Sequence, residues 1–175
     1  LCIMNHQMAI ATKASRVTRS TDKPVSEFGS RRAHGPWAAT YGGKAACIGG
    51  CVNTSNILTA NIFGVPASGT MAHSYVTSFG CTIKGELKAF TSYIETHRGE
   101  PLILLVDTYD TLNCGLKNAI HAYKMCGIDN SYPYGYGIRL DSGDLTYLSN
   151  KCREELDAEG FTNCKIFATN GLDEY

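Results

Sequence analysis

The sequence lacks the long apolar run that a membrane-spanning helix requires. Such a helix needs about 20 consecutive apolar residues, and no segment of this chain approaches that length. A charged and then apolar signal-peptide pattern is also absent from the first residues. The formal net charge is zero, so the chain has no general electrostatic attraction for nucleic acid. We therefore expect a cytoplasmic protein whose partners are neither membranes nor nucleic acids.

Paired metal ligands are absent too, although the chain contains eight cysteines. A structural zinc site is typically built from two short-spaced pairs of Cys or His, and only Cys47 and Cys51 lie near each other. A disulfide framework is typical of short secreted chains with little core, whereas 43% of these 175 residues are hydrophobic. We expect free, mostly buried thiols and no metal ion bound by the protein alone.

Short apolar runs alternate with amphipathic segments along the chain. Apolar residues at helical spacing predict helices within residues 4–17, 37–48, 87–94, 116–123 and 145–156. Before the last of these, Ser142 is the expected N-cap and Asp144 lies in the first turn. Buried strands are predicted at residues 24–28, 64–68, 102–106, 136–140 and 165–168.

This alternation predicts an α/β fold with a parallel sheet. Residues 102–106 are apolar at every position, which is typical of a strand that is covered on both faces. A doubly wound sheet would be expected to carry a Gly-x-Gly-x-x-Gly turn after a strand, and the sequence has none. We therefore predict a partial (β/α) barrel with parallel strands, and we place all five predicted strands in it.

Charged and polar residues follow every predicted strand. In a (β/α) barrel the C-terminal strand ends carry the active site. Arginines bind phosphate in a bidentate manner, carboxylates bind Mg²⁺, and a histidine beside a carboxylate serves as a base or nucleophile. The combination indicates a phosphorylated sugar as substrate. In strand order, these residues are Arg31 and Arg32, Thr70 and His73, Asp107 and Asp110, Arg139 and Asp141, and residues 170–174.

Simpler interpretations stay open for several of these residues. His73 could be satisfied by backbone groups, and Arg31 with Arg32 could form a solvated pair. Arg139 lies between two apolar residues and needs a partner if it is buried; Asp141, two residues on and on the same side of a strand, would supply a structural salt bridge. The small-residue loop at 49–56 could bind an anion at a helix N-terminus or be a plain turn. We expect His6, His97 and His121 to be surface or core residues, and His34 stays undecided.

Six ordered blocks of the sequence resemble the nicotinate phosphoribosyltransferase family. They extend over essentially the whole chain, and their order is that of the family. The blocks are residues 5–14, 27–33, 49–56, 69–74, 106–111 and 137–144. The resemblance implies a type II phosphoribosyltransferase, of which residues 1–175 would be a single fragment of the barrel domain. The N-terminal and C-terminal parts of the family chain would be absent.

The resemblance also implies a reaction. Phosphoribose would pass from phosphoribosyl pyrophosphate to nicotinate, giving nicotinate mononucleotide and pyrophosphate in NAD salvage. ATP hydrolysis would be coupled through a phosphohistidine, with Mg²⁺ accompanying the phosphates. A homodimer is plausible for such a family.

The resemblance assigns a role to each candidate residue. His73 matches the phosphorylated histidine and Asp107 its orienting carboxylate. Ser55 can donate to a carboxylate, which favours nicotinate over nicotinamide as substrate. The remaining substrate-binding residues by resemblance are Arg31 at nicotinate, Arg139 and Asp141 at the phosphoribosyl group, and Thr70 and Asp110.

Departures from the family pattern leave alternatives open. His34 stands where glutamine is expected, Trp37 where an acidic residue is common, and Gly171 where aspartate is common. The alternatives are a nicotinamide or quinolinate phosphoribosyltransferase, or a non-catalytic, truncated nucleotide-binding domain.

Overall fold

The computed structural model describes all residues from 1 to 175, and the chain forms two compact units. Unit 1 contains residues 1–69 and 171–175, and unit 2 contains residues 70–170. None of the helices combines the length and the apolar character that crossing a membrane would require.

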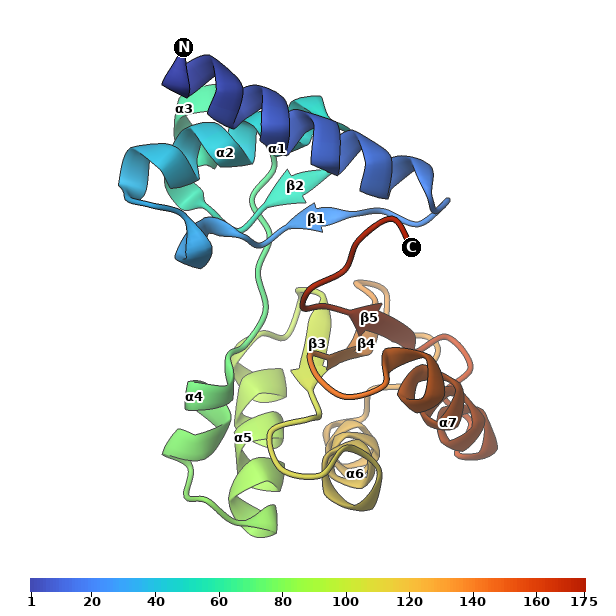
Figure 1. Ribbon diagram of the computed structural model, residues 1–175. Coiled ribbons are helices and arrows are strands. Elements are labelled where there is room, and N and C mark those ends of the chain that lie inside the picture. Colours follow the sequence, from blue (N-terminus) through green and yellow to red (C-terminus); the bar gives the residue numbers. More distant parts are fainter. The chain divides into compact units, whose positions relative to one another are not determined.

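Unit 1 is mainly helical, with a very short parallel strand pair (Figure 1). Glu27 pairs with Thr54, and Ser55 N donates to the Glu27 carbonyl at 2.9 Å. The C-terminal residues 171–175 belong to this unit, and the Glu174 carboxylate binds both Lys13 and Arg16 of the first helix. The elements are α1 (Cys2–Arg19), β1 (Ser26–Glu27), η1 (Ser30–Arg32), α2 (Pro36–Ile48), β2 (Asn53–Thr54) and α3 (Ile57–Phe63).

The glycine pair at residues 49–50 allows α1 to approach the end of α2. A Cβ at Gly49 would lie 2.5 Å from the Ala11 carbonyl oxygen, so no larger residue fits there. The Thr18 hydroxyl donates to the Gly49 carbonyl at 3.0 Å. The close packing of α1 against this loop therefore explains why glycines occupy these two positions. The helix opened by the same loop is α3, whose N-cap is Asn56.

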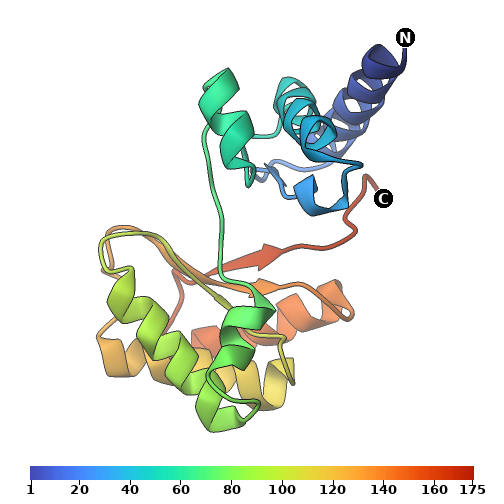
Figure 2. The ribbon, with the colours of Figure 1, turned by 90° about the vertical axis from the view of Figure 1, so that its left-hand side faces the viewer.

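Unit 2 contains a three-stranded parallel sheet in the order β3-β4-β5. Leu102 pairs with Tyr136, and Gly137 pairs with Lys165. Helices α5, α6 and α7 lie on one side of this sheet (Figure 2), as expected for helices that follow parallel strands. The elements are α4 (His73–Ser78), α5 (Ile83–Thr96), β3 (Leu102–Leu105), η2 (Thr111–Gly115), α6 (Leu116–Cys126), β4 (Tyr136–Leu140), α7 (Leu145–Ala158) and β5 (Lys165–Ala168).

Unit 2 has one hydrophobic core, formed by buried side chains that lie between Met71 and Cys164 in the sequence. Leu104 and Ile138 on neighbouring strands are fully buried. The hydroxyl of the fully buried Tyr123 lies 2.7 Å from the Gly137 carbonyl oxygen and 3.2 Å from that of Leu102, so it ties α6 to both strands. This core fixes the positions at which the strands end.

Three details of the structure correct the predictions. Residues 64–68 do not form a strand; only Ala67 bridges to Thr54, and Pro66 has no N–H to donate. Residues 53–54 form the unpredicted strand β2 instead. Ser142 is not the N-cap of α7, because Asp144 accepts from Tyr147 N while the Ser142 hydroxyl donates to Asp107.

The α/β class and the parallel strand direction are confirmed. The strands do not share one sheet, however, since β1 and β2 form a separate two-stranded sheet. Their pairing is set by contacts within unit 1, which the sequence pattern does not reveal. A partial barrel remains consistent with the three-stranded sheet of unit 2.

Candidate active site

The strands of unit 2 deliver polar residues to the same edge of the sheet. Asp107 and Thr108 follow β3, Asp141 follows β4, and Thr169 follows β5. Because the three strands are parallel and adjacent, their C-terminal ends meet at this edge. His73 begins α4 and reaches the same place. We call the set His73, Asp107, Arg139 and Asp141, for which a catalytic role is proposed below, the catalytic cluster.

Arg139 is almost completely engaged by protein acceptors. Its Nη2 donates to the Asp141 carboxylate at 2.8 Å, and its Nε donates to the Thr169 hydroxyl at 2.9 Å. Its Nη1 donates to the Thr70 hydroxyl at 2.9 Å and to the Met71 carbonyl at 3.2 Å. The side chain is only 11% exposed. Of the five guanidinium hydrogens, one on Nη2 is left for a ligand.

Asp141 is held in its ionised form. Burial alone would raise the pKa of its carboxyl, but hydrogen bonds from Thr169 and Arg139 and the nearby Arg139 charge lower it below the ordinary value. His73 contributes in the same direction. A carboxylate with a cationic partner and hydrogen-bond donors stays ionised at neutral pH, so Asp141 contributes a negative charge to the cluster.

Asp107 is the most buried acidic group of the cluster, with a side chain only 1% exposed. Its Oδ2 accepts from Asp141 N at 2.9 Å and from the Ser142 hydroxyl at 2.6 Å. Its Oδ1 is buried and has no hydrogen-bond partner. A buried carboxylate oxygen without a hydrogen-bond partner destabilises the fold. Oδ1 can therefore accept a hydrogen bond from a ligand or bind a cation.

His73 lies between these carboxylates and Thr108. Its Nε2 is 3.6 Å from Asp141 Oδ2 and 3.9 Å from Asp107 Oδ1, and its Nδ1 is 3.1 Å from the Thr108 hydroxyl. The ring is 42% exposed. A histidine with both nitrogens placed and one side open is suited to proton transfer or to nucleophilic attack.

Asp110 lies outside the catalytic cluster, although it is in the same loop as Asp107. Its carboxylate accepts from Asn113 N at 2.8 Å and from the Asn113 side-chain amide at 3.0 Å. These two bonds lower the pKa of the Asp110 carboxyl. In this structure Asp110 caps η2.

Arg31 and Ser55 belong to unit 1, where Glu27 shapes the backbone around them. Glu27 Oε2 accepts from the Thr54 hydroxyl at 2.6 Å, directly before Ser55. Its Oε1 accepts from Gly29 N, at the entrance to η1. The two oxygens of this half-buried carboxylate therefore fix both the short helix that carries Arg31 and the strand end that carries Ser55.

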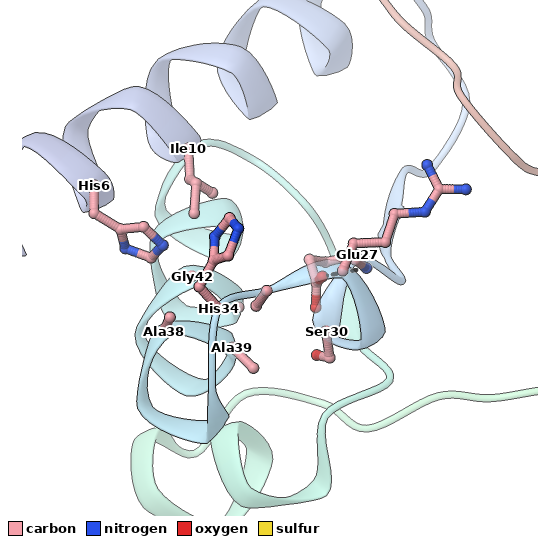
Figure 3. A pocket seen from close by; sticks show the side chains of 12 residues that line it. His6, Ile10, Glu27, Ser30, His34, Ala38, Ala39 and Gly42 are labelled. Atoms are coloured by element: carbon pink, nitrogen blue, oxygen red, sulfur yellow. Dashed lines mark hydrogen bonds between the residues drawn. The ribbon is translucent and has the colours of Figure 1, made fainter.

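Unit 1 also contains a cavity of about 290 Å³. Figure 3 shows His6 and Ile10 of α1 reaching it from one side, and His34 and the α2 residue Gly42 also line it. Arg32 lines this cavity and Arg31 does not. His6, expected to be a surface or core residue, is thus a cavity-lining residue together with His34.

Three further residues of the site were not predicted as functional from the sequence. Thr108 contacts the His73 ring, Thr169 bridges Arg139 and Asp141, and Ser142 holds Asp107. Thr108 and Ser142 stand next to predicted acidic residues, which was the available signal. Thr169 follows a predicted strand by one residue, but a lone threonine there carries no chemistry of its own.

No group of three or more His, Cys, Asp or Glu side chains, the catalytic cluster included, has the arrangement needed to hold a metal ion by itself. The eight thiols are free; Cys2 and Cys81 are exposed, and Cys114, Cys126, Cys152 and Cys164 are buried.

The fold and the cluster define a class: an α/β protein in which a histidine at the start of a helix meets two carboxylates and an arginine at the C-terminal ends of parallel strands. A family model, described as "Nicotinate phosphoribosyltransferase (NAPRTase) family", matches residues 24–168. The chain belongs to this family.

Individual relatives agree. The chain is 47% identical to the nicotinate phosphoribosyltransferase of Bacillus subtilis over 176 aligned residues, which is 100% of this chain and 34% of that protein. It is 34% identical to the Dictyostelium discoideum nicotinate phosphoribosyltransferase, covering 99% of this chain and 36% of that protein. The chain thus spans about a third of the length of these relatives.

Solved structures have the same fold. A crystal structure of human nicotinic acid phosphoribosyltransferase superimposes with a TM-score of 0.83 at 25% identity, over 97% of this chain and 43% of that one. A nicotinate-nucleotide pyrophosphorylase from Pyrococcus furiosus gives a TM-score of 0.78 at 34% identity, over 97% of this chain and 42% of that one.

Proposed function

We propose that this chain carries central catalytic residues of a nicotinate phosphoribosyltransferase. Phosphoribose passes from phosphoribosyl pyrophosphate to nicotinate: the bond from the sugar C1 to pyrophosphate breaks, and a bond from C1 to the pyridine nitrogen forms. Pyrophosphate leaves with the bonding electron pair, and nicotinate mononucleotide is the other product, in NAD salvage. The convergence of His73, Asp107, Arg139 and Asp141 in a member of this family carries the proposal.

The anionic substrate binds through few but well-placed groups. One Nη2 hydrogen of Arg139 is left for a phosphate oxygen, and Asp141 Oδ2, which lies 3.6 Å from His73 Nε2, is the acceptor for a ribose hydroxyl. Thr70 holds Arg139 through its hydroxyl and so supports binding without needing direct contact. Asp110 contributes in the same indirect way, because it caps η2 at the end of the loop that begins at Asp107.

ATP hydrolysis is coupled through His73 in this proposal. A neutral ring nitrogen attacks the γ-phosphorus, an N–P bond forms, and the bridging O–P bond breaks so that ADP leaves. Water later cleaves the N–P bond to release phosphate. The open side of the ring and the carboxylates near Nε2 support this role.

Mg²⁺ fits the site only together with substrate phosphates. The cluster offers the unpartnered Oδ1 of Asp107 and Oδ2 of Asp141, and one or two carboxylates plus phosphate oxygens are the usual Mg²⁺ environment. When bound, Mg²⁺ would neutralise charge on the leaving pyrophosphate. We further propose a cytoplasmic location and a homodimer, in line with the family.

The proposal is tested by phosphorylating the chain with γ-³²P-ATP. We expect acid-labile, base-stable label on the wild type and none on His73→Gln, while the control His97→Gln keeps the label. In an enzyme with the full family length, His73→Ala should abolish ATP stimulation and leave slow phosphoribosyl transfer. Absence of label together with absence of phosphoribosyl pyrophosphate binding would favour a non-catalytic nucleotide-binding domain instead.

Arg139→Ala tests the phosphoribosyl site separately. We expect binding of phosphoribosyl pyrophosphate to weaken, because the free Nη2 hydrogen is lost and Asp141 loses its cationic partner. Isothermal titration calorimetry measures the change, and Arg153→Ala, which alters a cation outside the cluster, is the control. An unaltered affinity for Arg139→Ala would remove this residue from the proposed site.

The acid-binding residues of unit 1 are tested by nicotinate titration followed by NMR. One charge-assisted hydrogen bond is worth about 1.5–3 kcal/mol, so Arg31→Ala should weaken binding by roughly tenfold or more. Arg32→Ala is the neighbouring comparison, since only Arg32 lines the cavity of Figure 3. If Arg32→Ala alone weakens binding, the cavity and not Arg31 holds the pyridine carboxylate. Ser55→Asp should shift the preference toward nicotinamide by repelling the acid.

A further inference from the structure

The two ring nitrogens of His73 have chemically different neighbours. Nδ1 lies 3.1 Å from the Thr108 hydroxyl, whereas Nε2 faces carboxylate oxygens of Asp141 at 3.6 Å and Asp107 at 3.9 Å. A neutral imidazole carries a single N–H, so its neighbours decide which nitrogen holds the proton. A hydroxyl can donate or accept, but an ionised carboxylate can only accept.

In the protein without bound Mg²⁺, the carboxylates therefore favour the proton on Nε2. Asp107 Oδ1 is buried and has no other hydrogen-bond partner, and it gains one if the ring moves slightly toward it. A lone pair on Nε2 would instead face two negative groups. With the proton on Nε2, Nδ1 keeps its lone pair and requires a donor.

Thr108 supplies that donor. Its hydroxyl has no other hydrogen-bond partner in the chain, so nothing competes with Nδ1 for its hydrogen. The residue is fixed by its place directly after Asp107 at the end of β3. A backbone carbonyl at the same place would impose the opposite tautomer, because it can only accept.

We infer that Thr108 is a positioning residue that, together with the two carboxylates, holds His73 as the Nε2–H tautomer, with its Nδ1 lone pair accepting from the Thr108 hydroxyl. This inference rests on the proposed function for its use, since a nucleophilic ring nitrogen must be unprotonated. The tautomer itself can be observed without any turnover.

The experiment is long-range ¹H–¹⁵N NMR of the imidazoles in wild type, Thr108→Val and Thr108→Ser, at a pH where titration shows the rings to be neutral. The wild-type His73 spectrum should show the Nε2–H pattern, with two widely separated nitrogen shifts. Thr108→Val removes the donor with little change in shape, and the two shifts should move toward each other as the tautomers mix. Thr108→Ser keeps the hydroxyl and should restore the wild-type pattern.

His97 provides a control within the same spectrum. Its Nδ1 lies 3.0 Å from the Tyr93 carbonyl oxygen, which requires the Nδ1–H tautomer. His97 should show that opposite pattern in all three proteins, and an unchanged amide spectrum away from residue 108 shows that each variant is folded. If Thr108→Val does not fold, Thr108→Ala is measured in its place.

Two outcomes would overturn the inference: an Nδ1–H pattern for wild-type His73, or an Nε2–H pattern that Thr108→Val and Thr108→Ala leave unchanged. Loss of phosphoryl labelling has a different meaning. An unlabelled chain with the expected tautomers would remove the proposed phosphohistidine and leave the role of Thr108 intact, so the two failures are distinguishable.

Discussion

Asp141 links the charges of the catalytic cluster to protein stability. It accepts hydrogen bonds from Arg139 and Thr169, and its carboxylate lies beside the His73 ring. The same contacts that lower its pKa also fasten the C-terminal ends of β4 and β5 to each other. Function and stability therefore meet at this one side chain.

The lowered pKa of Asp141 predicts a pH-dependent stability. A carboxyl with a folded-state pKa below its ordinary value of 3.8 stabilises the fold at pH above that value, and the contribution is lost as the pH falls through the folded-state pKa. Asp141→Asn should therefore lower the free energy of unfolding at pH 6 by about 2 kcal/mol. The difference from wild type should shrink as the pH falls below 3.8.

Urea unfolding at pH 6 and pH 3 measures this difference. Asp157→Asn is the matched control, because Asp157 pairs with Arg153 at the surface with a side chain 48% exposed. Such an exposed pair contributes about 0–1 kcal/mol. A stability deficit of Asp141→Asn that stays constant between the two pH values would contradict the lowered pKa.

At the scale of elements, a buried group of polar side chains holds in place the helices that follow the loop after β3. Glu86 of α5 is fully buried, and its carboxylate accepts from the Cys114 thiol at 2.9 Å and from the Asn118 amide at 2.8 Å. Burial and the Glu86 carboxylate raise the pKa of the Cys114 thiol to about 12, so this thiol stays protonated as a donor. The contacts of Glu86 with Cys114 and Asn118 join α5, η2 and α6, and η2 directly follows the loop that carries Asp107 and Thr108.

Gly115 permits the close approach of η2 to β3. A Cβ at this position would lie 1.8 Å from the Val106 carbonyl oxygen, which belongs to the backbone and cannot move aside. Gly115→Ala should therefore destabilise the protein by about 3 kcal/mol and displace Asp107. Gly69→Ala is the control, because a Cβ there would meet nothing within 4 Å.

Thermal unfolding followed by circular dichroism measures the Gly115→Ala effect. If Gly115→Ala melts at the same temperature as Gly69→Ala, η2 can move away from β3 at no cost in stability. The claim that residue 115 must be glycine would then be wrong.

At the scale of the whole molecule, the two units differ in how much apolar surface they bury. The continuous hydrophobic core lies between Met71 and Cys164, in unit 2. In unit 1, Ala45 and Ala46 are the buried hydrophobic residues, and α1 has no buried residue. Large apolar side chains such as Met4 and Met8 are more than 60% exposed there. Since burial of apolar surface is the main stabilising contribution, unit 1 is the weaker of the two.

Hydrogen exchange measured by mass spectrometry tests this difference. We expect the amides of α1 to exchange through low-energy local opening, and those of α6, with seven buried residues, to exchange only on unfolding of unit 2. The Glu174 contacts with Lys13 and Arg16 should protect α1 slightly, so Glu174→Gln should speed its exchange further. Equal protection of α1 and α6 would contradict the difference in core size.

Much of the fold could be predicted because the apolar runs and the apolar spacing in the sequence correspond to residues that pack together in the tertiary structure. The strands β3 and β4 are mostly buried apolar runs of a parallel sheet, and α1, α2, α5, α6 and α7 follow their apolar spacing. Strand β5 forms where it was predicted, but it is the edge strand and three of its four residues are exposed, so the prediction that it is buried was wrong. Strand β2 could not be predicted, since its two residues are polar and form a strand only by pairing with β1 and contacting Ala67. Helix α4 is too short to show a period.

The sequence by itself determined the residue types at the strand ends and the family, because both are carried by ordered local motifs. Only the tertiary structure decided which of these residues touch: it gave His73 its Thr108 and carboxylate neighbours, engaged Arg139 with protein acceptors, and assigned Asp110 and Asp144 to helix caps. The physical reason is that hydrogen bonds depend on distances between segments remote in sequence, and those distances are set by the packing of the whole core.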